Sequence, residues 1–216
     1  MKVKNIVISK NARYFILGEP GRHIRQTWFV CHGYGQLAEL FLREFKILDN
    51  GNHLVVAPEG LNRFYLHGGS GKVGASWMTS EDRLKEIEDY INYLDQVHAE
   101  IMNQGENNSE IINVLGFSQG TATASRWALQ GKSRVHRLIL WGGDIPPDTD
   151  WEAARGRLKT VKVQLVYGEA DPYIKPELLA QQKEMLEKNN ADYEIKTFNG
   201  HHEIQPAMLL ELADTK

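Results

Sequence analysis

The sequence predicts an α/β fold in which helices cover both faces of a mostly parallel sheet. Short runs of β-branched and aromatic residues alternate with longer stretches that have helical spacing, which is the pattern of successive βαβ units. The run Thr27–Cys31 is continuously apolar, as expected of a strand buried on both faces. No repeat, low-complexity segment or Pro/Gly/Ser linker divides the 216 residues. We therefore expect a single domain over residues 1–216.

Eight strands are expected in the sheet, and the last six of them are expected to be parallel. The first two, Lys4–Ser9 and Arg13–Leu17, flank Lys10-Asn11 and predict an opening hairpin. The other strands are predicted at Thr27–Cys31, His53–Ala57, Ile111–Leu115, Arg137–Trp141, Val161–Tyr167 and Tyr193–Phe198. Helices are predicted at Leu37–Leu48, Thr121–Gln130, Trp151–Leu158, Pro176–Lys188 and Pro206–Leu212. Little sequence separates the sixth and seventh strands, so we expect little or no cap domain.

The segment Glu59–Thr79 stands apart because it is rich in glycine and shows neither a helical period nor a convincing strand. A loop of this length inside a compact domain is usually functional. Thr79 and Asp82 then have the spacing of a capping box. Apolar residues from Leu84 to Ile101 recur at helical spacing and predict one long helix.

Composition excludes several classes of protein. The formal net charge is −3, and no basic patch points to a nucleic-acid partner. The first residues contain no apolar run long enough for a secretory signal or a membrane-spanning helix. Cys31 is the only cysteine, so no intramolecular disulfide is possible and a reducing compartment is favoured. We expect a cytoplasmic protein without stable membrane insertion.

The pentapeptide Gly116–Gly120, with the sequence GFSQG, matches the pattern G-x-S-x-G. In that pattern a sharp turn joins a strand to a helix and lifts the central serine clear of the sheet in a strained conformation. A predicted strand precedes the pentapeptide here and a predicted helix follows it. Ser118 is therefore predicted to be the nucleophile, with the Gln119 N–H as one oxyanion donor.

Four segments resemble the phospholipase/carboxylesterase branch of the α/β-hydrolases, which includes acyl-protein thioesterases. They are His32–Gly35, Gly116–Gly120, Gly168–Pro172 and Gly200–Ile204, in the family's order. The resemblance implies an α/β-hydrolase fold, esterase chemistry and no cofactor. One departure is Thr121, where the family often has a second glycine. This change is mild and narrows the space behind the serine.

The general base needs a carboxylate that fixes its tautomer, and in this fold the chain order is Ser, Asp or Glu, then His. Asp171 follows a predicted strand, although an Asp before a proline is commonly an Asx-turn residue. Asp144 also follows a predicted strand and competes for the role. The resemblance places the acid at Asp171.

Two adjacent histidines, His201 and His202, follow the last predicted strand. Only one can point at Ser118. The family pattern, in which small residues precede the histidine, puts His202 in the role of base and His201 where a glycine is common. His201 remains the alternative.

The loop after the third predicted strand, His32–Gly35, suits the second oxyanion donor because its glycines let the backbone approach a substrate. By resemblance, the Tyr34 N–H pairs with the Gln119 N–H, while His32 packs at the strand end. Four side chains of the long loop are candidates for the substrate pocket, although each could equally pack that loop down: Phe64, Tyr65, Trp77 and Met78.

Two other segments have partial matches to a phosphate-binding loop and to a metal site, and neither is predicted to have that function. Gly68–Lys72 has the look of a phosphate loop, but Leu66 and Val73 occupy positions that the pattern requires as glycine and Ser or Thr. Adjacent residues such as His201–Glu203 cannot readily converge on one ion, so no metal site is predicted.

The sequence thus predicts a metal-independent serine hydrolase that cleaves carboxylic esters of small or exposed acyl groups. One alternative is a thioesterase or lysophospholipase that acts on acylated protein, acyl-CoA or lysolipid with the same three residues. The other is a non-catalytic binding protein with a hydrolase fold.

Overall fold

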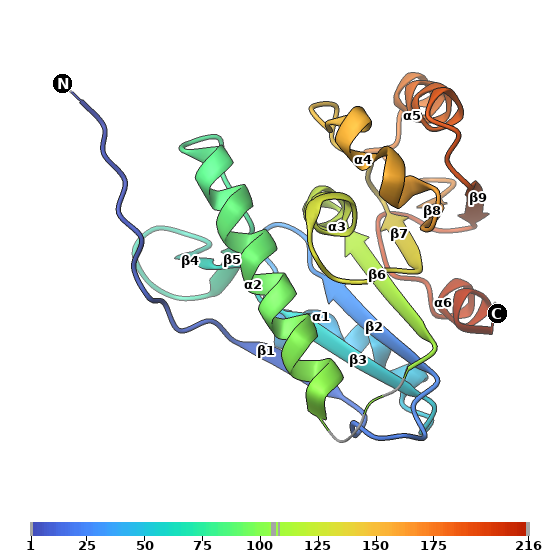
Figure 1. Ribbon diagram of the computed structural model, residues 1–216, viewed down its shortest axis with the longest axis horizontal. Coiled ribbons are helices and arrows are strands. Elements are labelled where there is room, and N and C mark those ends of the chain that lie inside the picture. The colour runs from blue at the N-terminus through green and yellow to red at the C-terminus, as the bar shows by residue number, and fades with distance from the viewer. Residues whose placement is uncertain (1, 105–106, 108, 215–216) are drawn as a thin grey trace.

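The computed structural model describes residues 2–104, 107 and 109–214, which form a mostly parallel seven-stranded sheet flanked by helices (Figure 1). The strands are β1 Tyr14–Leu17, β2 Gln26–Cys31, β3 His53–Pro58, β6 Ile111–Phe117, β7 Arg137–Trp141, β8 Lys162–Gly168 and β9 Tyr193–Phe198. Their order is β1-β3-β2-β6-β7-β8-β9. Only β1 pairs antiparallel with its neighbour, and the other six are parallel. The predicted α/β fold and the six parallel strands are confirmed.

The predicted opening hairpin is wrong, and the sheet has seven strands where eight were expected. Residues 2–12 form an extended arm that leaves the body of the molecule (Figure 1). The strand β1 pairs with β3, with Tyr14 opposite Pro58. The apolar residues of the arm, among them Ile6 and Val7, are exposed. A β-branched run has the propensity for a strand, but it becomes one only where a neighbouring strand and a core are available.

Helices cover both faces of the sheet, as predicted (Figure 1). The helices α2 Arg83–Asn103, α3 Gln119–Gln130, α4 Trp151–Leu158 and α5 Pro176–Lys188 pack on one face, and α1 Ala38–Leu42, the 3-10 helix η1 Arg43–Leu48 and α6 Pro206–Asp214 pack on the other. Alternate residues of β2 separate the two cores: Phe29 packs with Trp127, and Trp28 belongs to the cluster around Phe41. In the described chain, α4 is the only helix or strand between β7 and β8, so no cap is evident there.

The long segment after β3 contains two strands that the sequence did not predict. β4 Asn62–Tyr65 and β5 Val73–Ser76 form an antiparallel hairpin outside the main sheet. Gly74 lies so close to the loop after β2 that a Cβ on it would be 2.4 Å from the carbonyl oxygen of Gly35. Glycine therefore allows the hairpin to rest on that loop, and this same glycine content hid the strands in the sequence.

The predicted capping box does not form. α2 begins at Arg83, and its N-cap residue Asp82 has a left-handed backbone (φ 47°) without a side-chain cap. The N–H of Thr79 instead donates to the Glu86 carboxylate at 2.7 Å. A left-handed residue at the N-cap points the chain away from the geometry that the box needs.

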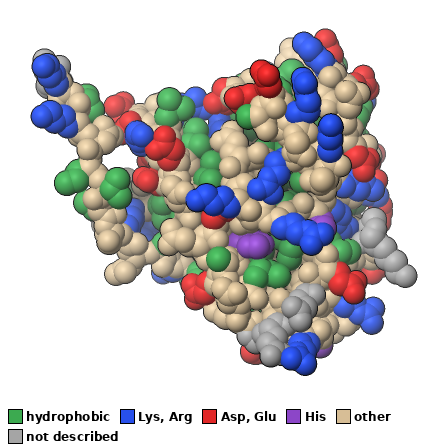
Figure 2. Space-filling view, viewed as in Figure 1, with side chains coloured by type: hydrophobic (Ala, Val, Ile, Leu, Met, Phe, Trp, Pro, Cys, Tyr) green, Lys and Arg blue, Asp and Glu red, His purple; other side chains and the backbone are tan. Residues whose placement is uncertain are grey.

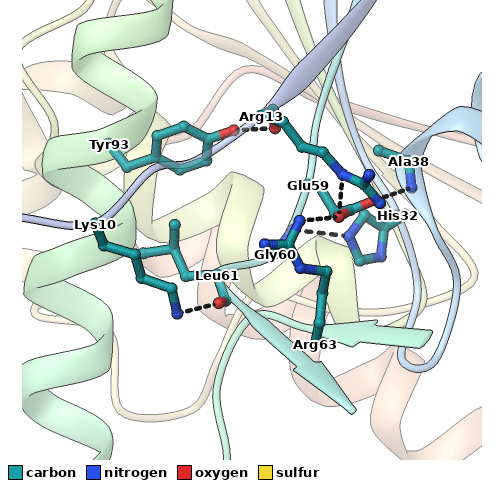
Figure 3. A network of polar contacts seen from close by, with 9 residues as sticks. All are labelled: Lys10, Arg13, His32, Ala38, Glu59, Gly60, Leu61, Arg63 and Tyr93. Atoms are coloured by element: carbon teal, nitrogen blue, oxygen red, sulfur yellow. Dashed lines mark hydrogen bonds and ion pairs between the residues drawn. The ribbon is translucent and has the colours of Figure 1, made fainter. Parts of the chain in front are cut away.

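The buried carboxylate of Glu59 links the β4–β5 hairpin to the start of β1 and to α1 (Figure 3). Glu59, at the end of β3, is only 2% exposed. It accepts hydrogen bonds from Arg13 Nε at 2.7 Å and Nη2 at 3.1 Å, from Arg63 Nη1 at 3.4 Å and from the N–H of Ala38 at 3.3 Å. Four donors on one carboxylate satisfy its charge without water.

Glu59→Gln is therefore expected to destabilise the protein by about 1–3 kcal/mol, because buried donors lose a charged acceptor. We expect the lower half of that range, since the arginine side chains are 46% and 43% exposed and water replaces part of the bonding. Urea denaturation measures the change. Glu39→Gln is the control: its ion pair with Arg43 is more than half exposed on both sides, so a change below about 0.5 kcal/mol is expected. Equal losses in both variants would contradict this role of Glu59.

The surface around α2 shows no separation of charge by sign, since acidic and basic side chains intermix over it (Figure 2). Within residues 2–104, 107 and 109–214, no helix is both long and apolar enough to cross a bilayer.

Candidate active site

Ser118 occupies a strained turn between β6 and α3. β6 ends at Phe117 and α3 begins at Gln119, and Ser118 between them has φ 53° and ψ −119°. This conformation is rare for a residue with a side chain, and the surrounding contacts must hold it. The Ser118 N–H donates to the carbonyl of Trp141 at 3.0 Å, and its own carbonyl accepts from Thr121 N at 3.0 Å and Thr121 Oγ1 at 2.7 Å. Both sides of the serine are thus fixed by hydrogen bonds.

The two outer glycines of the pentapeptide are required by close backbone approach. A Cβ on Gly116 would lie 2.2 Å from the carbonyl oxygen of Gly120, and a Cβ on Gly120 would lie 2.2 Å from that of Cys31. Thr121, the departure from the family pattern, is buried behind the turn, and a Cβ on Gly143 would be 2.4 Å from its hydroxyl. The threonine therefore fills the space behind the serine and adds a hydrogen bond to it.

The carboxylate of Asp171 holds the imidazole of His202. His202 Nδ1 lies 2.7 Å from Asp171 Oδ2, and the Asp171 side chain is 1% exposed while that of His202 is 19% exposed. The other carboxylate oxygen, Oδ1, accepts the N–H of Tyr173 at 2.9 Å. Asp171 is thus an Asx-turn residue and a histidine partner at the same time, so the two interpretations of its sequence position are compatible.

Neither of the two competing residues, His201 and Asp144, belongs to this hydrogen-bonded pair. His201 is exposed, and its Nδ1 lies 3.1 Å from the carbonyl oxygen of Ala170. Asp144 is partly buried, and burial raises the pKa of its carboxyl group. The carboxylate that contacts His202 is that of Asp171.

The ring of His202 is packed against the residues that surround Ser118. Its centroid is 4.8 Å from that of Phe117, the residue before the serine, and 4.8 Å from that of Tyr173. Gly142 lies beneath the ring, because a Cβ there would be 3.0 Å from His202 Nδ1, while a Cβ on the next residue, Gly143, would be 3.0 Å from the Ser118 carbonyl oxygen. A glycine pair after β7 therefore separates the serine turn from the His202–Asp171 pair. Sequence reasoning missed it, although two glycines directly after a buried strand are a signal of close approach.

The backbone N–H groups of Tyr34 and Gln119 belong to the two segments that flank the serine turn. Gly33 lies close to Ser118, since a Cβ on Gly33 would be 3.3 Å from Ser118 Cβ. Tyr34 is the next residue after Gly33 in the same loop. Gln119 is the first residue of α3, so its N–H has no acceptor within the helix. The positive end of the α3 dipole is at this position. The arrangement suits an oxyanion that develops above Ser118.

The side chain of Gln119 anchors the hairpin to this turn. Its amide nitrogen donates to Ser76 Oγ and to the carbonyl of Met78, both at 3.1 Å, and its amide oxygen accepts the N–H of Trp77 at 3.3 Å. The end of β5 is thereby fastened to the start of α3.

The four predicted pocket residues have different surroundings. Trp77 is 1% exposed in the core and donates its indole N–H to the His32 carbonyl at 2.8 Å, so the expectation that it lines a pocket is corrected. Met78 is partly buried and packs against the core. Phe64 lies against Tyr34 with ring centroids 5.2 Å apart, and Tyr65 is 48% exposed.

A groove of about 520 Å³ adjoins the loop that carries Tyr34. It is lined by residues 35–37, by Leu40, Phe41 and Glu44, and by Leu66, Lys72 and Val73. None of the four predicted pocket residues lines it. Phe41 connects it to the site, since its ring stacks 5.9 Å from that of Phe117. The predicted helix Leu37–Leu48 contains three of the groove's apolar residues, Leu37, Leu40 and Phe41, but sequence alone does not show which neighbouring segment they face.

Metal ligands are not grouped in the part of the chain that the structure describes: no three His, Cys, Asp or Glu residues lie together as a metal site.

The sheet order and the strand–turn–helix that carries Ser118 define an α/β-hydrolase. A family model described as phospholipase/carboxylesterase matches residues 13–215, and the chain belongs to that family. It is a carboxylesterase-type hydrolase.

Solved structures with the same fold are similar over nearly the whole chain. A carboxylesterase from Mesorhizobium loti has a TM-score of 0.71 and 20% identity, with 94% of this chain and 95% of that chain covered. Acyl-protein thioesterase 2 from Zea mays has a TM-score of 0.67 and 19% identity, with 94% and 96% covered. The Bacillus cereus carboxylesterase has a TM-score of 0.66 and 15% identity, with 93% and 91% covered. None of the curated proteins compared with the sequence matches it.

Proposed function

We propose that the protein hydrolyses carboxylic esters of small or partly exposed acyl groups through an acyl-enzyme on Ser118. The observation that carries this proposal is the 2.7 Å contact between His202 and the buried Asp171, beside a serine in a strained strand–helix turn. A serine hydroxyl is a poor nucleophile without a general base, and a histidine base needs such a carboxylate.

In the proposed reaction, His202 Nε2 removes the Ser118 hydroxyl proton while Oγ bonds to the substrate carbonyl carbon. The carbonyl oxygen becomes an oxyanion, which the N–H groups of Tyr34 and Gln119 stabilise. Collapse of this intermediate breaks the bond to the alcohol, which leaves with the proton from His202. Water then attacks the acyl-enzyme, with His202 again as the base, and releases the acid and free Ser118. Asp171 keeps the imidazole in the required tautomer throughout.

The groove beside Gly35 supports an apolar group on one side of the scissile bond. Its wall includes Leu40, Leu66 and Val73, which are all partly exposed. Burial of apolar surface from a substrate chain is favourable in such a groove. Because the groove is open and no cap is evident between β7 and β8 in the described chain, acyl groups of short to moderate length fit it best.

Activity on p-nitrophenyl acetate, butyrate, hexanoate, decanoate and palmitate tests this substrate class. We expect kcat/KM to peak at butyrate or hexanoate and to fall towards palmitate. Leu40→Glu, which puts a charge into the groove, is expected to lower kcat/KM for hexanoate about tenfold with a smaller effect on acetate. The control is Ile47→Glu, at an exposed residue of η1 that does not line the groove. A preference for palmitate, or equal effects of both variants, would contradict the assignment.

A thioesterase or lysophospholipase activity with the same residues is the second candidate. The similarity in fold to acyl-protein thioesterase 2 from Zea mays supports its inclusion. Rates on matched oxygen esters and thioesters of one acyl group separate the two. Turnover of any activated ester argues against a non-catalytic binding protein.

The proposal also includes a small-molecule ester as the substrate, no nucleic-acid partner, no cofactor and a cytoplasmic location. Cys31 is a free, fully buried cysteine, and burial raises the pKa of its thiol.

A further inference from the structure

We infer that His32 is a positioning residue that aims the N–H of Tyr34 at the oxyanion, by holding the carbonyl of the same peptide group. The inference rests on the proposed function, since it assigns a task to the oxyanion loop of that site. His32 is fully buried at the end of β2 and does not contact the reacting atoms in the proposed mechanism. Sequence reasoning left it as a packing residue.

The tautomer of His32 follows from its two hydrogen bonds. The N–H of Gly60 points at His32 Nε2 at 2.9 Å (Figure 3). Because an N–H only donates, Nε2 must be the unprotonated acceptor, and the ring proton of the neutral imidazole is on Nδ1. Nδ1 lies 2.8 Å from the carbonyl oxygen of Gly33, so it donates there. His32 therefore connects the end of β3 to the oxyanion loop through one defined tautomer.

The ring stays neutral in this position. Burial lowers the pKa of His32, which outweighs the opposite effects of its bond to Gly33 and of the Glu59 carboxylate. In a charged ring, Nε2 would carry a proton that faces the Gly60 N–H, and the two donors would repel each other. The neutral Nδ1–H tautomer is therefore the form that can make both bonds, from the Gly60 N–H and to the Gly33 carbonyl.

The hydrogen bond from His32 to the Gly33 carbonyl also sets the direction of the Tyr34 N–H, because the two groups share one peptide unit. The Gly33 carbonyl and the Tyr34 N–H belong to one planar trans unit, in which C=O and N–H point in opposite directions. Fixing the carbonyl towards buried His32 therefore fixes the Tyr34 N–H away from the core. Gly33 is also the residue of this loop whose Cβ would come within 3.3 Å of Ser118 Cβ. Within the described chain, the Tyr34 N–H has no hydrogen-bond acceptor of its own.

Two further contacts hold the loop and the ring. Gln36 closes the turn, since its N–H donates to the Gly33 carbonyl at 3.2 Å and its side-chain oxygen accepts the Gly33 N–H at 2.7 Å. Trp77 lies against His32 with ring centroids 5.0 Å apart. The Gly33 carbonyl keeps the Gln36 bond when His32 is replaced, so the Tyr34 N–H is misaligned rather than removed. We therefore expect a smaller effect than the roughly 10²–10³-fold loss that follows deletion of an oxyanion donor.

Two substitutions separate the two bonds of His32. In His32→Asn, Nδ2 occupies the place of Nδ1 and can still donate to Gly33, while the acceptor for Gly60 is lost. In His32→Gln, Oε1 occupies the place of Nε2 and can still accept from Gly60, while the donor to Gly33 is lost.

We expect His32→Gln to lower kcat on p-nitrophenyl butyrate by about tenfold, with KM little changed. His32→Asn should lower kcat less than about threefold. Affinity for a trifluoromethyl ketone, which forms a tetrahedral oxyanion on Ser118, should fall by the same factor as kcat in each variant.

The control is His98→Asn, a partly buried histidine elsewhere in the core whose Nε2 has no partner among the described residues. It should alter the melting temperature without changing kcat or inhibitor affinity.

Equal losses of kcat in His32→Asn and His32→Gln, or wild-type inhibitor affinity in His32→Gln, would overturn the inference while leaving the proposed function intact. An inactive wild-type protein would instead overturn the function. Should either variant fail to fold, nitrogen NMR of the wild-type imidazole decides: the inference requires the Nδ1–H tautomer, and an Nε2–H or charged ring contradicts it.

Discussion

Ser118→Ala is expected to lower kcat for p-nitrophenyl butyrate on the order of 10⁴- to 10⁶-fold, as removal of a catalytic serine does in other hydrolases. The physical reason is that no other hydroxyl is held in the strained turn between β6 and α3. The fold should survive, because the bonds that fix the turn come from backbone atoms of Ser118 and from Thr121. Steady-state kinetics and a melting curve measure both effects.

Ser125→Ala is the matched control for this substitution. Ser125 is a fully buried serine in α3, the helix that follows Ser118, and its hydroxyl has no hydrogen-bond partner among the described residues. Its removal should leave kcat within about twofold, because the Ser125 hydroxyl makes no hydrogen bond to any described residue of the site. A Ser118→Ala variant with more than about one-tenth of the wild-type kcat would mean that another group is the nucleophile.

His202→Ala is expected to reduce kcat by a similar factor, on the order of 10⁴- to 10⁶-fold, because Ser118 then has no general base. His201→Ala should change kcat less than about threefold. The adjacent histidines differ in their partners: His202 contacts the buried Asp171, whereas His201 is exposed and contacts the carbonyl of Ala170. Kinetics on one activated ester compare the two directly.

The assignment of the base would be wrong if His201→Ala were the inactive variant. Combining both substitutions adds a second check. If His202 alone is the base, the double variant should be no slower than His202→Ala within error, because residues that act as one unit are non-additive.

Much of the fold could be predicted because the central strands of the sheet are buried on both faces. β7 has the predicted bounds, and β2, β3, β6 and β8 differ from them by one or two residues, since continuous apolar runs between helical stretches are distinctive. The edge strand β9, which is only partly buried, also has the predicted bounds. The arm at residues 2–12 and the β4–β5 hairpin were not predicted correctly. In both, the outcome depends on contacts far along the chain: β1 pairs with β3 and not with the arm that precedes it, and Gly74 of the hairpin rests on Gly35.

Some features of the candidate site could also be predicted from local sequence, and others could not. The GFSQG pentapeptide could be recognised because Gly116 and Gly120 are needed wherever this turn is built. The choice between His201 and His202 needed either the family pattern or coordinates, because adjacent residues face different directions in a way that spacing does not reveal. The groove beside Leu40 and the bond from His32 to Gly33 are tertiary contacts, and no local pattern marks them.

Covalent labelling of the native protein with a fluorophosphonate probe, followed by mass spectrometry of its peptides, tests the central claim most directly. The probe forms a stable bond with an activated serine oxygen. The account predicts that one site is modified and that it is Ser118, with labelling lost in both Ser118→Ala and His202→Ala but retained in Ser125→Ala. Modification at another residue, or equal labelling of the native protein and Ser118→Ala, would contradict it.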